Sequence, residues 1–308
     1  MNKAYTKGLI SVVVINRNHG EYIAQTLESI LRQDYKRVEV IIVDALSTDN
    51  SIQEISKYSQ KLDIRVIREF DFGSSHGIIK GVNKVRGEFF VITTSTDGFL
   101  DQRWFSYAIN LLNRKKKLAG VQGRISIVNA KGETANKYYQ SRFQSTLSPG
   151  GFFCHWLFRG IPILETTCIW RTALVRDLLP PENDYQRDNN LLSKDCIYEL
   201  KFNVMSNLKL IKPTSIVAGF VRTHGRRLSA EREISRLSLV HQLDYIANIK
   251  ALRRQVRRSS KKFFFNFQEE QQITFPGKIL FFLEFVLSFP AAVALLIYSK
   301  LRNSIKNN

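Results

Sequence analysis

Four groups of polar and acidic side chains each follow an apolar stretch in the first third of the chain. They are Asn16–Asn18, Asp44 with Ser47–Asp49, Glu69–Gly73, and Thr94–Asp97. Side chains of these types can hydrogen-bond a nucleobase and a ribose, and a carboxylate oxygen can bind a divalent cation. Any one group alone is also what a tight turn requires. All four groups at the same edge of one sheet would indicate a binding site.

The stretches before these groups have the pattern of buried strands that alternate with helices. Apolar and β-branched residues predict strands over Leu9–Asn16, Val38–Asp44, Asp63–Arg68 and Phe89–Thr93. Apolar residues at helical spacing predict helices over Glu21–Gln33, Ser51–Ser59 and Ser74–Val85. This order indicates an α/β fold with a parallel sheet covered on both faces. Right-handed connections then place every carboxyl end, and so every polar group, at one edge.

The alternation of strands and helices weakens beyond residue 100. We expect a helix over Gln102–Lys116, a strand over Leu118–Val128 with a turn at Asn129–Gly132, and a loop at Pro149–Gly151. The later sequence favours a helix over Leu191–Met205, an extended segment over Leu208–Val221 and a long basic helix over Ser229–Arg258.

The composition is that of an ordinary globular chain. Of its 308 residues 44% are apolar, which excludes wholesale disorder, and 7 Pro with 16 Gly exclude collagen-like and Pro-rich sequences. The three cysteines, Cys154, Cys168 and Cys196, have no close spacing. They therefore indicate no zinc ribbon, CxxC motif or disulfide framework, and we expect buried reduced thiols.

The net charge of +19 is unevenly distributed, and the segment near the C-terminus holds more than its share. Residues 250–308 hold 11 Lys and Arg against three acidic residues, and the apolar segment Ile279–Tyr298 follows the densest basic run. About twenty apolar residues match one bilayer crossing, and basic residues nearby favour the cytoplasmic side. We expect this segment to span a membrane or lie on it, with a core or dimer helix as the alternative. The apolar run Leu9–Ile15 is too short for a signal peptide, so we expect a cytoplasmic body.

The segment Ser11–Ser51 closely resembles the opening of family 2 glycosyltransferases. That opening consists of an apolar strand, PTYNR, a helix carrying ESIL-Q, a second apolar strand and DGxSTD. The residues in register are Asn18, Glu28, Ser29, Gln33, Asp44, Ser47, Thr48 and Asp49. Glu69–Gly87 resembles the next element, EpDkG followed by Lys-Gly and a closing Gly, and the strand that ends in Thr94–Asp97 resembles an NSDD element.

The resemblance implies a GT-A fold, which is α/β with a Rossmann-like, mostly parallel sheet flanked by helices, here with a helical membrane-associated tail. It divides the chain into a nucleotide-sugar-binding half (1–100), a half for the acceptor and the catalytic base (101–245), and the tail (246–308). It implies an inverting transferase that uses Mg²⁺ or Mn²⁺ and a nucleotide-diphospho-sugar donor. The acceptor would be a glycan or lipid-linked hydroxyl in surface polysaccharide biosynthesis, at the cytoplasmic face of a bacterial inner membrane.

Site residues follow from the same resemblance. Asp44 would contact the nucleobase, Asp71 would lie near the nucleoside, and Asp97 would bind the metal. The other residues assigned to donor binding are Asn16, Asn18, Gly73, Lys80 and Thr96.

The second half of the chain matches the family more loosely. Ser193–Leu200 resembles the family's acidic helix, so Asp195 is the candidate general base, with Asp188 as second choice. Phe220–Ser229 resembles the family's R-x-H-G-x-S segment. There His224, Arg226 and Arg227 could reach the diphosphate or the metal, with His224 assigned to the metal and Arg226 to the donor. An ordinary surface imidazole is the alternative for His224, and a capping or structural carboxylate for Asp195.

Several positions depart from the family pattern. Thr96 stands where the family often has a second aspartate, Ala45 replaces a carboxylate, and His76 and Ile79 replace an Asp and an Asn. These departures leave open a non-catalytic nucleotide-sugar or glycan-binding membrane protein. A nucleic-acid-binding protein has only the net charge in its favour, so nucleic acid is not an expected partner. The sequence gives no oligomeric state.

Overall fold

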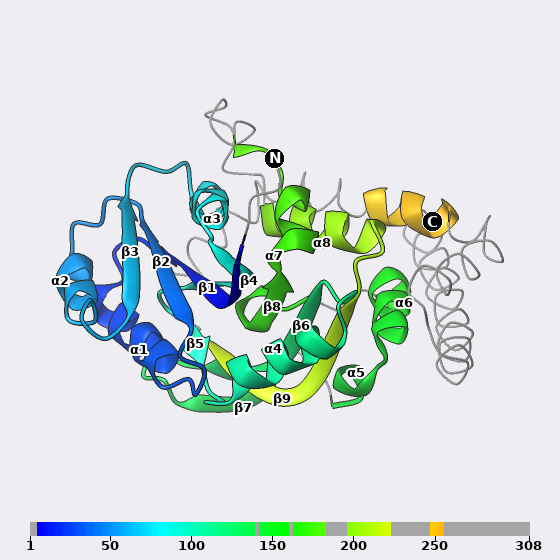
Figure 1. The fold of residues 1–308 in the computed structure, drawn as a ribbon, viewed down its shortest axis with the longest axis horizontal. Helices are drawn as coiled ribbons and strands as arrows, with labels where there is room; N and C mark the ends of the chain where they lie inside the picture. Colours follow the sequence, from blue (N-terminus) through cyan, green and yellow to red (C-terminus); the bar gives the residue numbers. More distant parts are fainter. Residues whose placement is uncertain (1–4, 139–141, 160–162, 183–195, 223–246, 256–308) are drawn as a thin grey trace, which may run out of the picture.

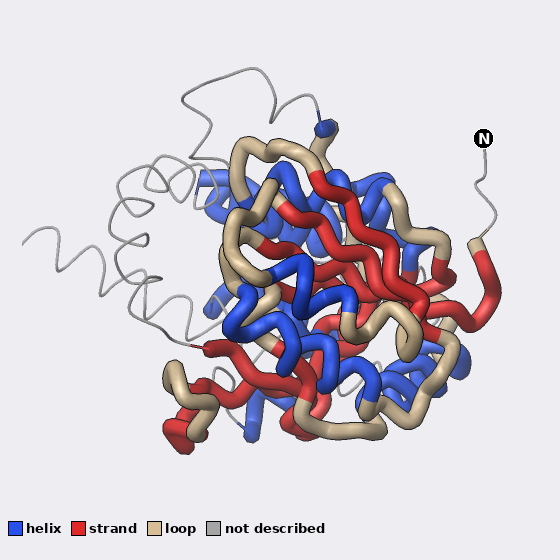
Figure 2. The backbone as a smooth tube through the Cα atoms, turned by 90° about the vertical axis from the view of Figure 1, so that its left-hand side faces the viewer, coloured by secondary structure: helices blue, strands red, loops and turns tan. Residues whose placement is uncertain are grey.

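One nine-stranded sheet organises the computed structural model, which describes residues 5–138, 142–159, 163–182, 196–222 and 247–255. The strand order is β3-β2-β1-β4-β8-β6-β9-β5, and β7 pairs with β6. Figure 2 shows the strands side by side with helices on both faces. The strands before and after residue 100 therefore belong to a single sheet, and the helices of both halves pack on it.

The elements that build and cover this sheet range in length from two to twelve residues. The strands are β1 (Thr6–Asn16), β2 (Val38–Asp44), β3 (Asp63–Arg68), β4 (Gly87–Thr94), β5 (Gly98–Phe99), β6 (Gly120–Val128), β7 (Thr134–Tyr138), β8 (Cys168–Arg171) and β9 (Ile211–Arg222). The α-helices are α1 (Gly20–Leu31), α2 (Ser51–Ser56), α3 (Ser74–Asn83), α4 (Trp104–Arg114), α5 (Arg142–Thr146), α6 (Pro149–Arg159), α7 (Thr172–Val175) and α8 (Cys196–Ser206). The 3₁₀ helices are η1 (Glu165–Thr167) and η2 (Arg176–Leu178).

The first four strands are parallel, as the sequence predicts. The side chains of β1 and β2 are buried along most of their length because helices cover both faces of this part. From β1 the chain adds β2 and then β3 on one side, through the connecting helices α1 and α2. It then crosses back through α3 to β4, on the other side of β1. Right-handed connections therefore place α3 on the face opposite α1 and α2, which is the arrangement in Figure 1.

The prediction of a mostly parallel sheet is wrong for the second half, because the whole sheet is mixed. β8 runs antiparallel to both of its neighbours, β4 and β6. β5 runs antiparallel to β9, and β7 runs antiparallel to β6. β6 and β9 are parallel to each other. The direction of β8 could not be predicted because a strand of four residues has no periodicity that sets it apart from a buried loop.

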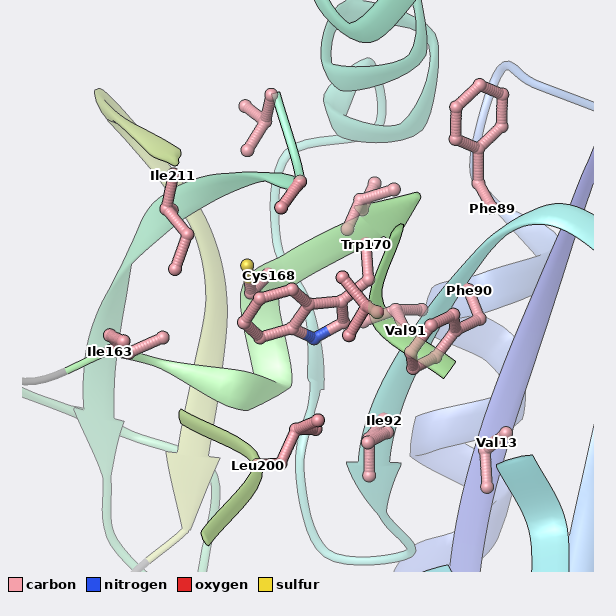
Figure 3. Close-up of a cluster of buried hydrophobic side chains, with 14 of the residues drawn as sticks. Val13, Phe89, Phe90, Val91, Ile92, Ile163, Cys168, Trp170, Leu200 and Ile211 are labelled. Carbon is pink, nitrogen blue, oxygen red and sulfur yellow. The ribbon is translucent and has the colours of Figure 1, made fainter. Parts of the chain in front are cut away.

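The two halves of the sheet meet around Trp170 on β8. Trp170 pairs with Phe90 of β4 on one side and with Gly120 of β6 on the other. Figure 3 shows its buried indole among Cys168, Val91 and Leu200. A Cβ at Gly120 would lie only 2.9 Å from Cys168 Sγ, so this crossing needs a glycine. The hydrophobic core is thus continuous between the two halves.

The expectation of a loop at Pro149–Gly151 is also wrong, since these residues begin α6. Proline is well suited to the first turn of a helix, where its missing N–H has no partner in any case. The aromatic side chains Phe152 and Phe153 that follow are buried, and α6 packs against β9. Burial of this apolar segment therefore outweighs the low helix propensity of the two glycines.

The basic and apolar tail falls largely outside the described residues. Residues 247–255 are helical, and Ile279–Tyr298 is not described. Within the described ranges no helix is both long and apolar enough to cross a bilayer.

Candidate functional site

The carboxyl ends of the four parallel strands form one edge of the sheet. Asn16 at the end of β1 pairs with Asp44 of β2, and Asp44 pairs in turn with Arg68 of β3. On the other side of β1, Ile15 pairs with Thr94 of β4. The four polar groups of the sequence therefore follow one another along this edge.

Asp44 is fully buried and organises the loop that follows β2. Its Oδ1 accepts hydrogen bonds from Asn16 Nδ2 (2.7 Å) and Ser47 Oγ (2.5 Å), and its Oδ2 accepts one from Ser47 N (3.0 Å). Arg68 Nε lies 3.6 Å from Oδ2. These contacts hold residues 45–47 against β1. Contact of Asp44 with a nucleobase stays a prediction.

The loop after β1 is attached to the loop after β2. Asn18, at a positive φ of 53°, accepts a hydrogen bond from Thr48 N (2.8 Å) through Oδ1, and its own N donates to Ser47 Oγ (2.9 Å). In the described part of the chain, the buried Oδ1 of Asn16 has no hydrogen-bond partner. A ligand at this edge could supply the missing donor.

The loop after β3 is held by α3. Asp71 is buried, and its Oδ1 accepts a hydrogen bond from Gly73 N (2.9 Å). Gly73 has a φ of 110°, a conformation that favours glycine. Lys80 of α3 donates to Glu69 Oε2 (3.0 Å) and to the carbonyl of Phe70 (2.8 Å). The hydrogen bond from Lys80 lowers the pKa of Glu69, so this ion pair persists below neutral pH.

Asp97 lies in the turn after β4 and is buried. Its Oδ1 accepts hydrogen bonds from Arg222 N (3.1 Å) and Thr96 Oγ1 (3.3 Å). Thr96 Oγ1 is also 2.9 Å from Thr94 Oγ1. From α1, Thr26 Oγ1 donates to the carbonyl of Asp97 (2.6 Å). Asp97 is thus fixed by its own turn and by two segments that are distant in the sequence, α1 and β9.

A cavity of about 430 Å³ adjoins Asp97. Its volume is within the usual range for small-molecule sites, about 300–1,000 Å³. One part of its wall is aliphatic and comes from β1, α3, β4, β6, α8 and β9. The polar part consists of Ser74, Ser75, Thr93, Thr94, Asp97, Glu165, Thr166 and Lys201. Thr93 Oγ1 is buried and lacks a partner among the described residues, so it can accept or donate a bond to a ligand.

The predicted donor residues are brought to one edge but not into one cavity. Of those in the described part, Asp97 lines the cavity. Asp71 is not part of the cavity wall, but it lies close to Ile15, which is: a Cβ at Gly77 would be 3.0 Å from Asp71 Oδ2 and 3.5 Å from Ile15 Cγ2. Asp44 lies at the end of β2, one strand beyond the cavity-lining Ile15 of β1, and its side chain contacts Asn16.

Four residues near Asp97 and the cavity were not predicted from the sequence. Thr26 and Arg222 hold Asp97, and the ion pair between Lys201 Nζ and Glu165 Oε2 (2.6 Å) lines the cavity. Arg222 belongs to the segment that resembles R-x-H-G-x-S, so that match could have indicated it. The other three have no motif that would have indicated them.

Three predicted site residues lie outside the described residues, namely Asp195, His224 and Arg226, and so does the second choice, Asp188. Among the residues that are described, no three His, Cys, Asp or Glu side chains form a cluster suited to a metal. Asp97 with the Thr94 and Thr96 hydroxyls is the oxygen-rich group beside the cavity.

Comparison with known proteins identifies the family. The model of "Glycosyl transferase family 2" matches residues 11–166. Poly(ribitol-phosphate) beta-N-acetylglucosaminyltransferase TarS of Staphylococcus aureus is 27% identical over 202 residues, 64% of this chain and 33% of TarS. Glycosyltransferase GlyG of Streptococcus pneumoniae is 37% identical over 91 residues, 29% of this chain and 30% of GlyG. The matches therefore span about a third of the length of these relatives.

The fold is shared with a solved structure. The crystal structure of S. aureus TarS 1–349 in complex with UDP-GlcNAc superposes with a TM-score of 0.57 and 19% identity. The superposition covers 92% of this chain and 81% of that one. Because the family model matches about half of the residues, the chain belongs to glycosyl transferase family 2.

Proposed function

We propose that this chain is an inverting, metal-dependent glycosyltransferase. It moves a sugar from a nucleotide-diphospho-sugar to a hydroxyl of a glycan or lipid-linked acceptor in surface polysaccharide biosynthesis. The observation that carries the proposal is the buried Asp97 at the carboxyl edge of the sheet, beside a cavity of about 430 Å³. The relatives support it, since TarS was solved with UDP-GlcNAc and another relative is a poly-beta-1,6-N-acetyl-D-glucosamine synthase.

Asp97 fits the role of a metal ligand. Mg²⁺ commonly takes one or two protein carboxylates and completes its coordination with substrate phosphates and water. A single buried carboxylate beside a cavity, with Thr94 and Thr96 hydroxyls nearby, suits that pattern. When bound, the cation would neutralise the charge that develops on the leaving diphosphate.

The acceptor side is assigned to α8 and the residues that precede it. Ile197 and Lys201 of α8 line the cavity, and Asp195 comes two residues before Ile197 in the sequence. In the proposed step Asp195 takes the proton of the acceptor hydroxyl. The hydroxyl oxygen bonds to the anomeric carbon as the bond to the diphosphate breaks, and the diphosphate leaves with the electron pair. One displacement inverts the anomeric configuration.

The first test is a donor screen with UDP-, GDP- and dTDP-sugars, UDP-GlcNAc included, in the presence of Mn²⁺ or Mg²⁺. Asp97→Asn should lower turnover at least about 100-fold because the cation loses its charged ligand. Asp34→Asn is the matched control, since Asp34 is exposed and follows the far end of α1. Unchanged turnover in Asp97→Asn would refute the metal assignment.

The second variant is Asp195→Asn. It should slow turnover and leave donor binding intact, because the base acts on the acceptor. Loss of donor binding would contradict its role as base.

A non-catalytic nucleotide-sugar-binding protein is the second candidate. The observation in its favour is Thr96, a neutral residue beside Asp97. The same screen separates the two, because a non-catalytic protein would bind a donor without turnover or hydrolysis.

We further propose that the basic and apolar tail holds the enzyme at the cytoplasmic face of a membrane. The support is the sequence alone, namely 11 Lys and Arg in residues 250–308 and the apolar segment Ile279–Tyr298.

A further inference from the structure

His76 is a buried histidine on the first turn of α3, and it contacts the loop that carries Asp71. Its Nδ1 lies 3.2 Å from Phe72 N. Its ring also lies against the Phe72 ring, with centroids 5.4 Å apart and planes at 33°. The main chain and the side chain of Phe72 therefore both contact the same imidazole.

The contact with Phe72 determines which nitrogen of His76 carries the proton. A backbone N–H can only donate, so Nδ1 must accept with its lone pair. The neutral ring then carries its hydrogen on Nε2, which faces Glu182 Oε1 at 3.5 Å. That distance is longer than an ordinary hydrogen bond, so the contact with Glu182 is a weaker electrostatic one.

The position of His76 explains why this contact matters for the loop. Gly73 is the N-cap of α3, which makes His76 the third residue of the helix. In a capping box the side chain of the third helical residue accepts a hydrogen bond from the N-cap N–H. His76 reaches back in a similar way but accepts from Phe72 N, one residue before the N-cap. The N-cap N–H of Gly73 donates instead to Asp71 Oδ1 (2.9 Å). Both N–H groups at the tip of the loop are thus satisfied.

We propose that His76 is a positioning residue for the donor site. Through Nδ1 it fixes the main chain at Phe72, and so holds the Asp71 carboxylate at the edge of the sheet where the nucleoside would bind. This rests on the proposed function, because the role of Asp71 belongs to that proposal. The hold on the loop itself rests on the geometry of α3 alone.

Three substitutions separate the two nitrogens of the ring. In His76→Asn the side-chain oxygen can take the place of Nδ1 and accept from Phe72 N. In His76→Gln the polar group lies further out, where Nε2 was. His76→Ala removes both. Val82→Ala is the matched control, since Val82 is a fully buried residue of α3 that truncation also destabilises.

Two readouts test the proposal in the full chain. The first is amide hydrogen exchange in the peptide that contains Phe72. The second is the affinity for UDP, GDP or dTDP by calorimetry, with donor KM and kcat from the screen above. We expect His76→Ala and His76→Gln to speed exchange at Phe72 and to raise donor KM about tenfold, the effect of one lost hydrogen bond. kcat should change less than KM, and His76→Asn should restore both values.

The outcomes distinguish the two proposals. Equal exchange and equal KM in His76→Asn and His76→Ala would overturn the role of Nδ1. An equal rise in KM in Val82→Ala would show that stability alone is responsible. If none of the nucleotides binds the unmodified chain, the proposed function and the donor role of His76 both fail, and exchange then decides the hold on the loop.

Discussion

Leu46 has a backbone conformation that leucine rarely adopts. Its φ is 53°, in the left-handed region. Because the residue is 48% exposed, burial of its side chain offsets little of the energy that this conformation costs. It lies between Asp44 and Ser47, whose hydrogen bonds shape the loop after β2. The left-handed conformation costs a residue with a Cβ about 1–2 kcal/mol. The strain is therefore located in the loop that Asp44 organises at the candidate site.

Leu46→Asn should stabilise the protein, because asparagine tolerates the left-handed region better than leucine. We expect the free energy of unfolding to rise by about 0.5–1 kcal/mol, measured by urea denaturation. Leu100→Asn is the control, since Leu100 is 45% exposed and is not among the described residues with positive φ. A loss of stability in Leu46→Asn would mean that the leucine side chain makes a stabilising contact that outweighs its strain.

At the scale of elements, the amino edge of the sheet is held by one buried carboxylate. Glu39 of β2 accepts hydrogen bonds from Ser11 Oγ (2.5 Å) and Arg86 N (2.9 Å) through Oε1. Its Oε2 accepts from Arg86 Nε (2.8 Å) and Arg65 Nη2 (3.2 Å). These bonds join β1, β2, β3 and the start of β4 at the edge opposite the candidate site. Register at one edge fixes register at the other, since the strands are continuous.

Glu39→Gln should destabilise the fold in a pH-dependent way. Burial alone would raise the pKa of Glu39, but the hydrogen bonds from Ser11 and Arg86 outweigh it, and the pKa lies below its ordinary value. The folded state therefore favours the charged form. Its stabilisation is complete above the unfolded pKa of about 4.3 and is lost as the pH falls through the lowered folded pKa. At pH 7 we expect a loss of about 1.5–3 kcal/mol, the range for hydrogen bonds to a charged group, because the two arginines left behind are partly exposed to water.

The check is urea denaturation of both proteins between pH 7 and pH 3. The gap in unfolding free energy should narrow as the pH falls below about 4, since protonation then removes the charge from the unmodified chain too. Glu28→Gln is the control, because Glu28 forms an exposed pair with Arg32 and should change stability by less than about 0.5 kcal/mol. A gap that stays constant with pH would contradict the role of the charge.

At the scale of the whole molecule, the order and direction of the strands were predictable in the first half of the fold but not in the second, although α4, β6 and β9 of the second half were predicted to within about three residues of their bounds. A strand buried on both faces reads as a continuous apolar run, so β2 was predicted with its observed bounds. The bounds of β3 were also predicted, although this edge strand is only partly buried. The second half depends on contacts between distant segments. β8 has four residues and β5 has two, and each is a strand only because a partner lies beside it. Such pairing leaves no periodic pattern in the sequence.

The candidate site divides in the same way. The sequence predicted Asp44, Asp71 and Asp97 as site residues because each ends or follows a predicted strand within a recognisable motif, and the structure places all three along one edge of the sheet. It did not identify what holds them. Arg222 N reaches Asp97 from 125 positions away, and its guanidinium bonds the carbonyls of Asn129 and Ala130. Arrangements of this kind are properties of the folded chain.

The uneven charge of the chain leads to the last prediction, which concerns where the whole molecule resides. We expect it to cosediment with vesicles that contain anionic phospholipid, and to bind less in high salt. Replacing Arg254, Arg257, Arg258 and Lys261 with Gln should weaken binding by up to about a thousandfold, because each basic residue near the surface contributes about 1 kcal/mol. The control replaces the exposed run Arg114–Lys117 with Gln, which removes an equal charge elsewhere.

An equal loss in both variants would show that net charge alone attracts the vesicles, and it would overturn the proposal that the tail is the attachment. Unchanged binding in both variants would leave the apolar segment Ile279–Tyr298 as the anchor, whereas preferential binding of either protein to generic DNA would favour a nucleic-acid partner instead.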